Sequence, residues 1–326
     1  MVRSGAAARQ LGHTNMEVSP IGLGGLQCCQ GHGLSGRVYA SIGQDTVDEI
    51  VRTARAGGVT WFDTAEMYGG GQSERMLATA LRKDGAAPGD VVIATKWPPL
   101  LRTSGNIGRT IGERLDCLAG YPVGLYQIHM PHGALSPIRA QVAAMAGLLR
   151  AGKIGAVGVS NFSARQMEDA DAVLRAHGAR LTSNQVHANL LHRDIERNGV
   201  LATARRLGVT LIAYAPLAGG LLTGAYHADP RAARARSWAR RMMGGVYGRG
   251  AVARRRPLID TMRAIGTAYG VSVAQVALAW LIGRYGDTLV AIPGASKPSQ
   301  AAESAAAMDV RLTDAERARL DEITGR

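Results

Sequence analysis

Short apolar runs recur at regular intervals along the chain, and longer stretches with a helical repeat of apolar positions separate them. The first seven runs are β-branched or aliphatic and continuous rather than alternating, which is typical of parallel strands covered on both faces. Eight strands are predicted: Pro20–Leu26, Thr60–Thr64, Val91–Lys96, Val123–His129, Ile154–Ser160, Thr182–His187, Thr210–Ala215 and Leu289–Pro293.

The stretches between these runs are helix candidates, and several of them end at a glycine, the usual C-terminal stop. They include Gln44–Ala56, Ser73–Leu81, Ile138–Arg150, Ala164–Ala176, Arg197–Arg206, Leu258–Tyr269, Val273–Arg284 and Thr313–Ile323. Eight strand–helix units in about 270 residues favour an α/β fold, the (β/α)8 TIM barrel, over an open sheet. Residues 11–20 are expected to form an N-terminal β-hairpin at the bottom of the barrel. A long loop should follow strand seven. No linker divides the chain, so residues 1–326 are predicted to be one domain.

The composition agrees with a globular protein: 46% of the 326 residues are hydrophobic and 19% are charged. No apolar stretch approaches the roughly 20 residues that span a bilayer, and no signal-peptide pattern is visible at the N-terminus. The three cysteines lack metal-type spacing and fit reduced thiols. These features predict a cytoplasmic protein.

The formal charge of +13 is unevenly placed, since residues 225–256 hold nine arginines and one aspartate. A basic segment of this kind can bind nucleic acid, a membrane surface or a phosphorylated cofactor, or can be a solvated loop. Only Trp238 and Tyr247 supply aromatic side chains for stacking on bases, so nucleic acid is disfavoured. Neither nucleic acid nor a membrane is expected as a partner.

Polar side chains stand at the carboxyl end of nearly every predicted strand, where a barrel places its catalytic residues. They are Asp63, Lys96, His129, Ser160, Asn161, Gln185 and Tyr214. A buried carboxylate is costly unless it is paired. Asp63 therefore either caps the following helix or pairs with a cation, and Lys96, one strand over, is the candidate partner.

The residues near this pair define a chemistry. A lysine ammonium held by a carboxylate lowers the pKa of a hydroxyl that it touches, and Tyr68 lies five residues beyond Asp63. A phenol, whose pKa in water is near 10, becomes a usable general acid when that pKa is shifted toward neutrality. His129 can donate to a substrate oxygen. Together these groups can polarise a carbonyl and protonate it as it becomes an alcohol. None of them donates hydride, so a cofactor is required.

Eight segments resemble the aldo-keto reductases, in the family's order, from Leu11 to about Ala307. They are FDTAEMYGGGQSE, VVIATKW, LYQIHMP, GKIGAVGVSNF, NQVHAN, AYAPLAGGLLTG, ALAWLI and IPGASKPSQAAES. The sequence is most similar to the bacterial branch that also resembles potassium-channel β subunits. The resemblance implies a catalytic group of Asp63, Lys96 and His129, with Tyr68 as the general acid.

The resemblance also implies NADPH (NADP+) lying extended across the barrel mouth. Ser160, Asn161 and Gln185 would bind the carboxamide, and Tyr214 would stack under the nicotinamide ring. Leu217 and Gly219 would follow the pyrophosphate. The adenosine and its 2′-phosphate would fall to Ser296, Lys297, Gln300 and Glu303. Lys297 and the basic segment favour NADPH, because an extra phosphate suits a cationic pocket. Ser304 stands where the family commonly has asparagine, which weakens the expected hold on adenine.

The predicted activity is NADPH-dependent reduction of an aldehyde or ketone by a monomer or homo-oligomer. The alternative is a cofactor-binding regulatory or interaction subunit with vestigial activity. Gln185 and Tyr214 can also be read as ordinary interior residues of a barrel. His129 and His132 form an HxxH without a third ligand, so no metal site is expected.

Overall fold

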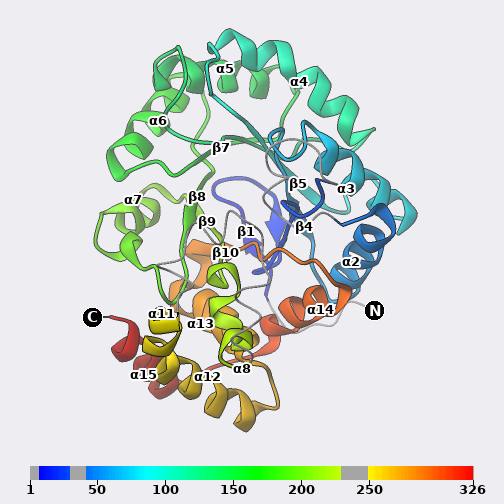
Figure 1. Cartoon of the computed structure of the whole chain (residues 1–326). Coiled ribbons are helices and arrows are strands. Elements are labelled where there is room, and N and C mark those ends of the chain that lie inside the picture. The colour runs from blue at the N-terminus through cyan, green and yellow to red at the C-terminus, as the bar shows by residue number, and fades with distance from the viewer. Residues whose placement is uncertain (1–6, 30–41, 229–248, 326) are drawn as a thin grey trace.

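The computed structural model describes residues 7–29, 42–228 and 249–325. Eight parallel strands form the centre of the molecule, and helices surround them as a ring (Figure 1). The strands are β3 (Leu23–Gly24), β4 (Trp61–Asp63), β5 (Val92–Trp97), β6 (Leu125–Ile128), β7 (Ala156–Ser160), β8 (Ser183–His187), β9 (Thr210–Tyr214) and β10 (Leu289–Ala291). Each lies within or next to a predicted run, which confirms the (β/α)8 barrel.

The sheet runs in chain order from β3 to β10 and closes on itself. Parallel bridges join Ile21 to Ala291 and Gly24 to Gly294. The Gly22 amide donates to the Ala291 carbonyl oxygen at 2.8 Å. All strand carboxyl ends therefore face one opening of the barrel.

The outer helices are those that the periodicity predicts, together with two that it does not identify. They are α2 (Gln44–Ala56), α3 (Gln72–Lys83), α4 (Gly105–Leu118), α5 (Ile138–Arg150), α6 (Ala164–Ala176), α7 (Val200–Leu207), α12 (Arg256–Tyr269), α13 (Val273–Tyr285), α14 (Pro298–Ala306) and α15 (Asp314–Thr324). Helices α4 and α14 are the two additional ones. Three glycines dilute the pattern of α4, although Ile107, Ile111 and Leu118 still form its buried face.

The opposite end of the barrel is closed by the predicted hairpin, made of β1 (Arg9–Gln10) and β2 (Glu17–Val18), which starts two residues earlier than expected. The Gly12 amide donates to Thr210 Oγ1 at 2.8 Å, at the start of β9. Leu11 and Val18 pack into the barrel's inner core with Trp61, Ala94, Leu125, Ala156, Ile212, Val290 and Ile292.

The basic segment after β9 is helical at both described ends. It begins beyond η2 (Ala218–Thr223) with α8 (Ala225–Ala228) and reaches α12 through α11 (Arg249–Arg254). The expected long loop is therefore interrupted by helix. Residues 229–248, with Trp238 and Tyr247, lie outside the described residues. Within the described ranges no single helix has the length and apolarity to cross a membrane; α12 and the stretch Val273–Thr288 pass that test only as a pair bent by 93°.

Candidate active site

Asp63 and Lys96 form a buried ion pair at the carboxyl ends of adjacent strands β4 and β5. Lys96 Nζ donates to Asp63 Oδ1, and also to the carbonyl oxygen of Thr64 at 2.8 Å. The Asp63 and Lys96 residues are 1% and 0% exposed. Helix α3 instead has Gly71 at its N-cap, without a side-chain cap. The helix-cap alternative for Asp63 is therefore wrong, and the predicted pairing with Lys96 is present.

The second oxygen of Asp63 is held by two glutamines. Gln185 Nε2 donates to Asp63 Oδ2 at 2.8 Å, and Gln127 Nε2 donates to the same oxygen at 3.2 Å. Sequence reasoning missed Gln127, although a polar residue inside the buried run LYQI is a usable signal. Gly158 lies opposite Gln127 on β7, and a β-carbon there would meet Gln127 Cγ at 2.9 Å. The glycine thus leaves room for the amide to reach Asp63.

Tyr68 and His129 adjoin this pair. Lys96 Nζ lies 5.1 Å from the centre of the Tyr68 ring. The rings of Tyr68 and His129 meet edge to face, with centroids 5.8 Å apart. Burial acts to lower the pKa of Lys96, but the Asp63 carboxylate and Tyr68 outweigh it, so the pKa of Lys96 is raised. The lysine is therefore a fixed positive charge beside the phenol.

His129 is neutral at physiological pH. Burial, together with the charge of Lys96, lowers the pKa of His129 to about 3. Its Nδ1 is buried and has no hydrogen-bond partner among the residues that the structure describes. A neutral imidazole can donate one hydrogen bond and adds no second positive charge beside Lys96.

The low pKa of His129 predicts acid destabilisation. The unfolded chain, with a histidine pKa near 6.5, binds this proton before the native state does, so the free energy of unfolding falls as pH drops below about 6.5. The slope from this residue approaches roughly 1.4 kcal/mol per pH unit. Denaturant unfolding of the wild type and His129→Gln at pH 5 and pH 7 measures it. A shallower pH dependence in the variant is expected, and equal slopes would contradict the assignment.

The polar residues of β7, β8 and β9 form a connected group. Asn161 Nδ2 donates to Ser160 Oγ at 3.0 Å, and Ser160 Oγ donates to the Gln185 carbonyl oxygen at 3.1 Å. Tyr214 Oη donates to Asn161 Oδ1 at 3.1 Å. Asn161 is exposed and has a left-handed backbone, with φ of 60°. The structure therefore brings these sequence-predicted residues together at the barrel opening.

Tyr214 is backed by a stack of histidines that sequence reasoning missed. Its ring lies 5.2 Å from that of His187 and nearly parallel to it. His187 in turn stacks on His192 at 4.1 Å. Burial is the main cause of a lowered pKa at His187, and His192 adds to it. The segment NQVHAN gives a signal for His187, which lies two residues after Gln185. Its stacking partner His192 follows only after a turn, so the sequence does not show that the two rings meet.

The remaining predicted cofactor residues lie beyond β9 and β10, which are neighbours in the sheet. Leu217 and Gly219 stand at the start of η2, where Gly219 has φ of 64°. The Ser296 amide donates to Gln300 Oε1 at 2.8 Å. Exposed Lys297 is the N-cap of α14, and half-buried Glu303 lies on that helix. These residues frame the barrel opening on the side away from β5 and β6.

A buried ionic cluster next to β5 was also missed. Arg114 Nη1 lies 3.1 Å from Glu74 Oε2 and 3.9 Å from Glu66 Oε2. Arg102 Nη1 lies 2.7 Å from Glu66 Oε1. Thr95 Oγ1 donates to Glu74 Oε1 at 2.5 Å. Burial raises the pKa of Glu74, and the charge of Arg114 opposes this. We name Glu66, Glu74, Arg102 and Arg114 the buried charge cluster.

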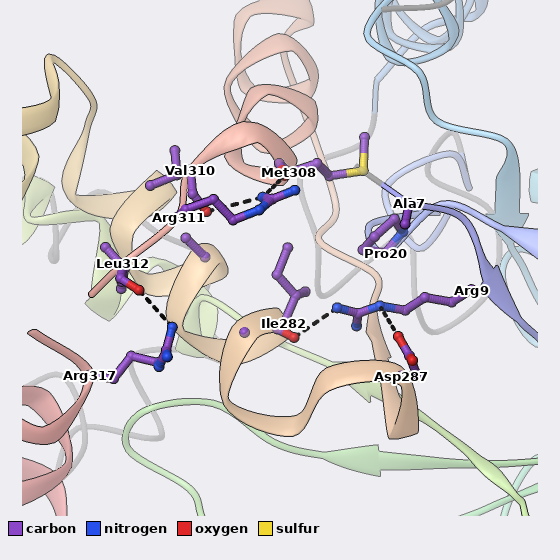
Figure 2. A pocket seen from close by; sticks show the side chains of 12 residues that line it. Ala7, Arg9, Pro20, Ile282, Asp287, Met308, Val310, Arg311, Leu312 and Arg317 are labelled. Atoms are coloured by element: carbon purple, nitrogen blue, oxygen red, sulfur yellow. Dashed lines mark hydrogen bonds and ion pairs between the residues drawn. The ribbon is translucent and has the colours of Figure 1, made fainter. Parts of the chain in front are cut away.

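A cavity of about 170 Å³ lies at the other end of the barrel, near the starts of β3 and β10 (Figure 2). Arginines line it, but they bind main-chain oxygens: Arg9 donates to Ile282, and Arg317 donates to Leu312 at 2.6 Å. It is remote from the candidate active site. Within the described ranges, no group of three or more His, Cys, Asp or Glu side chains is placed to hold a metal ion.

A barrel with an aspartate–lysine pair, a tyrosine and a histidine at its carboxyl end is the architecture of a class of carbonyl oxidoreductases. The sequence pattern of the aldo/keto reductase family matches residues 20–324, so the chain belongs to this family.

Relatives are similar over nearly the whole length. An uncharacterized oxidoreductase of Mycobacterium tuberculosis is 40% identical, with 95% of this chain and 93% of that protein covered. The chloroplastic pyridoxal reductase of Arabidopsis thaliana is 29% identical, over 94% and 83%. The crystal structure of the thermostable aldo-keto reductase Tm1743 with the inhibitor epalrestat superimposes with a TM-score of 0.76 at 29% identity, covering 97% and 99% of the two chains. These comparisons support carbonyl reduction in general.

Proposed function

We propose that the protein reduces an aldehyde or ketone to an alcohol with NADPH, reversibly, as a single-domain enzyme of the cytoplasm. The observation that carries the proposal is the buried Lys96–Asp63 pair beside Tyr68, with neutral His129 at the same opening. The family membership supports an oxidoreductase acting on carbonyl groups. Among relatives, the names pyridoxal reductase and 6-dehydroglucose reductase describe different substrates, so the family does not assign one.

Each of the four residues has a proposed part. Tyr68 donates its phenolic proton to the substrate oxygen. Lys96 stabilises the phenolate that this leaves, because its charge lies 5.1 Å from the ring centre and Asp63 holds it in place. His129 donates a hydrogen bond that keeps the substrate oxygen near Tyr68. Removal of any of these groups weakens an interaction that is strongest as charge develops on oxygen.

The residues at the barrel opening suit a nicotinamide cofactor. Asn161 is exposed there with its amide oriented by Ser160 and Tyr214, and one face of the Tyr214 ring is covered by His187, which orients the ring. When bound, NADPH supplies the hydride. Gln185 would contribute its amide oxygen and its second N–H, since one Nε2 hydrogen is donated to Asp63. Leu217 and Gly219 would line the pyrophosphate path, with Ser296, Lys297, Gln300 and Glu303 around the adenosine.

Titration with NADPH and NADH, followed by fluorescence, tests the cofactor assignment. We expect NADPH to bind more tightly than NADH, and Lys297→Ala to reduce that preference by about tenfold, because a charge-assisted contact to the 2′-phosphate is lost. NADH affinity should be unchanged in the variant. Equal affinity of the wild type for the two cofactors would contradict the NADPH assignment, and an unchanged preference in Lys297→Ala would contradict the assignment of Lys297. Lys153→Ala is the matched control. Lys153 is an exposed lysine three residues before β7, at the opposite end of the barrel.

The regulatory-subunit alternative makes a different prediction for the same preparation. A vestigial enzyme would hold the cofactor but turn over slowly on every carbonyl compound, and would form a stable complex with another protein. Turnover of a good substrate at or above about 1 s⁻¹, within the usual range of enzymes, would exclude it. Sedimentation of the same sample distinguishes a monomer from a homo-oligomer.

A further inference from the structure

In the described part of the chain, two loops at the carboxyl end of the barrel carry most of the exposed large apolar side chains. Among the described residues, Leu101 is 82% exposed, Leu135 is 66% exposed and Leu100 is 46% exposed, and Tyr269 on α12 is the other such residue at 39%. Leu100 and Leu101 follow β5, and Leu135 follows β6. We name Leu100, Leu101 and Leu135 the leucine rim. The strands that precede these loops carry the site residues: β5 contains Lys96, and β6 is followed directly by His129.

The two loops are fastened to each other. The Leu101 amide donates to the Gly133 carbonyl oxygen at 2.7 Å, and the Leu135 amide donates to the Arg102 carbonyl oxygen at 2.8 Å. Leu100 packs against Gly133, because a β-carbon at that glycine would lie 2.6 Å from Leu100 Cδ2. The leucine rim is therefore part of one ordered unit.

The rim is also tied to the reacting groups. Arg102, the residue after Leu101, places Nη1 2.7 Å from Glu66 Oε1. Glu66 precedes Tyr68 by two residues, and its amide donates to the Lys96 carbonyl oxygen at 3.3 Å. The cation of this loop is thus paired with Glu66, and the ion pair joins the loop of Leu100 and Leu101 to the segment that carries Tyr68.

Leu101 has a backbone that does not suit a leucine. Its φ is 53°, in the left-handed region, where a β-carbon is crowded and glycine or asparagine is favoured. Core packing does not offset this strain, since the Leu101 side chain is 82% exposed. Strained backbone that the surroundings hold in place is concentrated at functional sites. Among the described non-glycine residues with positive φ, Leu101 is the one that combines this strain with a large exposed apolar side chain.

We propose that Leu101, with Leu100 and Leu135, determines substrate specificity by packing on the apolar part of the carbonyl substrate. The preferred substrates would then be aldehydes or ketones that carry a hydrocarbon chain or ring, rather than small polyhydroxylated ones. This inference rests on the proposed reductase function. Burial of hydrocarbon against the rim removes apolar surface from water, which favours such substrates.

The test compares octanal with glyceraldehyde as substrates of the wild type and of Leu101→Asn. Asparagine tolerates the left-handed backbone, so the variant should keep or raise the Tm. The ratio of kcat/KM for octanal to that for glyceraldehyde should fall about tenfold, mainly through the KM of octanal. The kcat for glyceraldehyde and the affinity for NADPH should be unchanged. Leu135→Ser should shift the ratio in the same direction.

Tyr269→Ser is the matched control, because it removes an exposed apolar ring at the end of α12, away from the rim. It should leave the ratio unchanged. An unaltered ratio in both Leu101→Asn and Leu135→Ser would overturn the proposal. A lower Tm of Leu101→Asn with an unaltered ratio would also overturn it, because the leucine would then serve the stability of the fold. Dissociation of an oligomer with an unaltered ratio would also overturn it, since the rim would then be a subunit contact.

Failure of the reductase function itself is seen separately, as a wild type that reduces neither aldehyde. In that case calorimetric titration with 1-octanol tests whether the leucine rim binds an apolar ligand. Weaker binding to Leu101→Asn than to the wild type supports an apolar ligand site, and equal or absent binding overturns it.

Discussion

Replacing Tyr68 with phenylalanine is expected to lower kcat by about 10²–10⁴-fold, the range for loss of a general acid. The variant removes one hydroxyl and keeps the ring that lies 5.1 Å from Lys96 Nζ and edge-on to His129. Because the ring stays, NADPH affinity and the Tm should stay near the wild-type values. Single-turnover reduction with excess enzyme measures the chemical step directly.

A second tyrosine provides the control for this result. Tyr269→Phe removes a hydroxyl that bonds Glu316 at 2.8 Å on the surface, so its kcat should match that of the wild type. Near-native turnover by Tyr68→Phe on a substrate that the wild type reduces well would refute Tyr68 as the acid. A loss of both turnover and cofactor binding would show instead that the hydroxyl organises the site.

The barrel and the ion pair are predictable because both are dictated by local pattern and a rigid topology. Eight apolar runs give eight strands, and parallel strands bring residues at successive carboxyl ends into register. Asp63 and Lys96 therefore meet although 33 residues separate them. His129 adjoins them for the same reason, and Tyr68 reaches them from the loop that follows β4. The family resemblance adds roles to these residues, and the geometry is compatible with those roles.

What the sequence does not reveal depends on side-chain direction and on contacts between loops. Gln127 reaches Asp63 only because Gly158 leaves space across the sheet. The strain at Leu101 is a backbone property that the letters LL do not show. Arg114 resembles any surface arginine of an amphipathic helix until α4 is seen to turn it inward, where it is 3% exposed. Such features arise from tertiary packing, which local pattern does not encode.

Arg114 is expected to be the residue of the buried charge cluster whose loss destabilises the fold most. Arg114→Met removes the charge 3.1 Å from Glu74 and leaves that fully buried carboxylate without its ion-pair partner. Breaking a buried ion pair in this way costs about 3–5 kcal/mol in the free energy of unfolding. Denaturant unfolding at pH 7 measures it. The exposed pair of Arg206 and Glu168 is the control, and Arg206→Met should cost at most about 1 kcal/mol.

The pH dependence of that loss identifies its cause. The pKa of Glu74 is already raised by burial, and removing Arg114 takes away an opposing influence. A buried acid with a raised pKa binds its proton in the native state first, so lowering the pH from 7 to 5 should shrink the difference between variant and wild type. Glu74→Gln in the Arg114→Met background should recover much of the stability, since an amide oxygen still accepts from Thr95. A deficit independent of pH and of Glu74→Gln would mean that Arg114 stabilises α4 by packing alone.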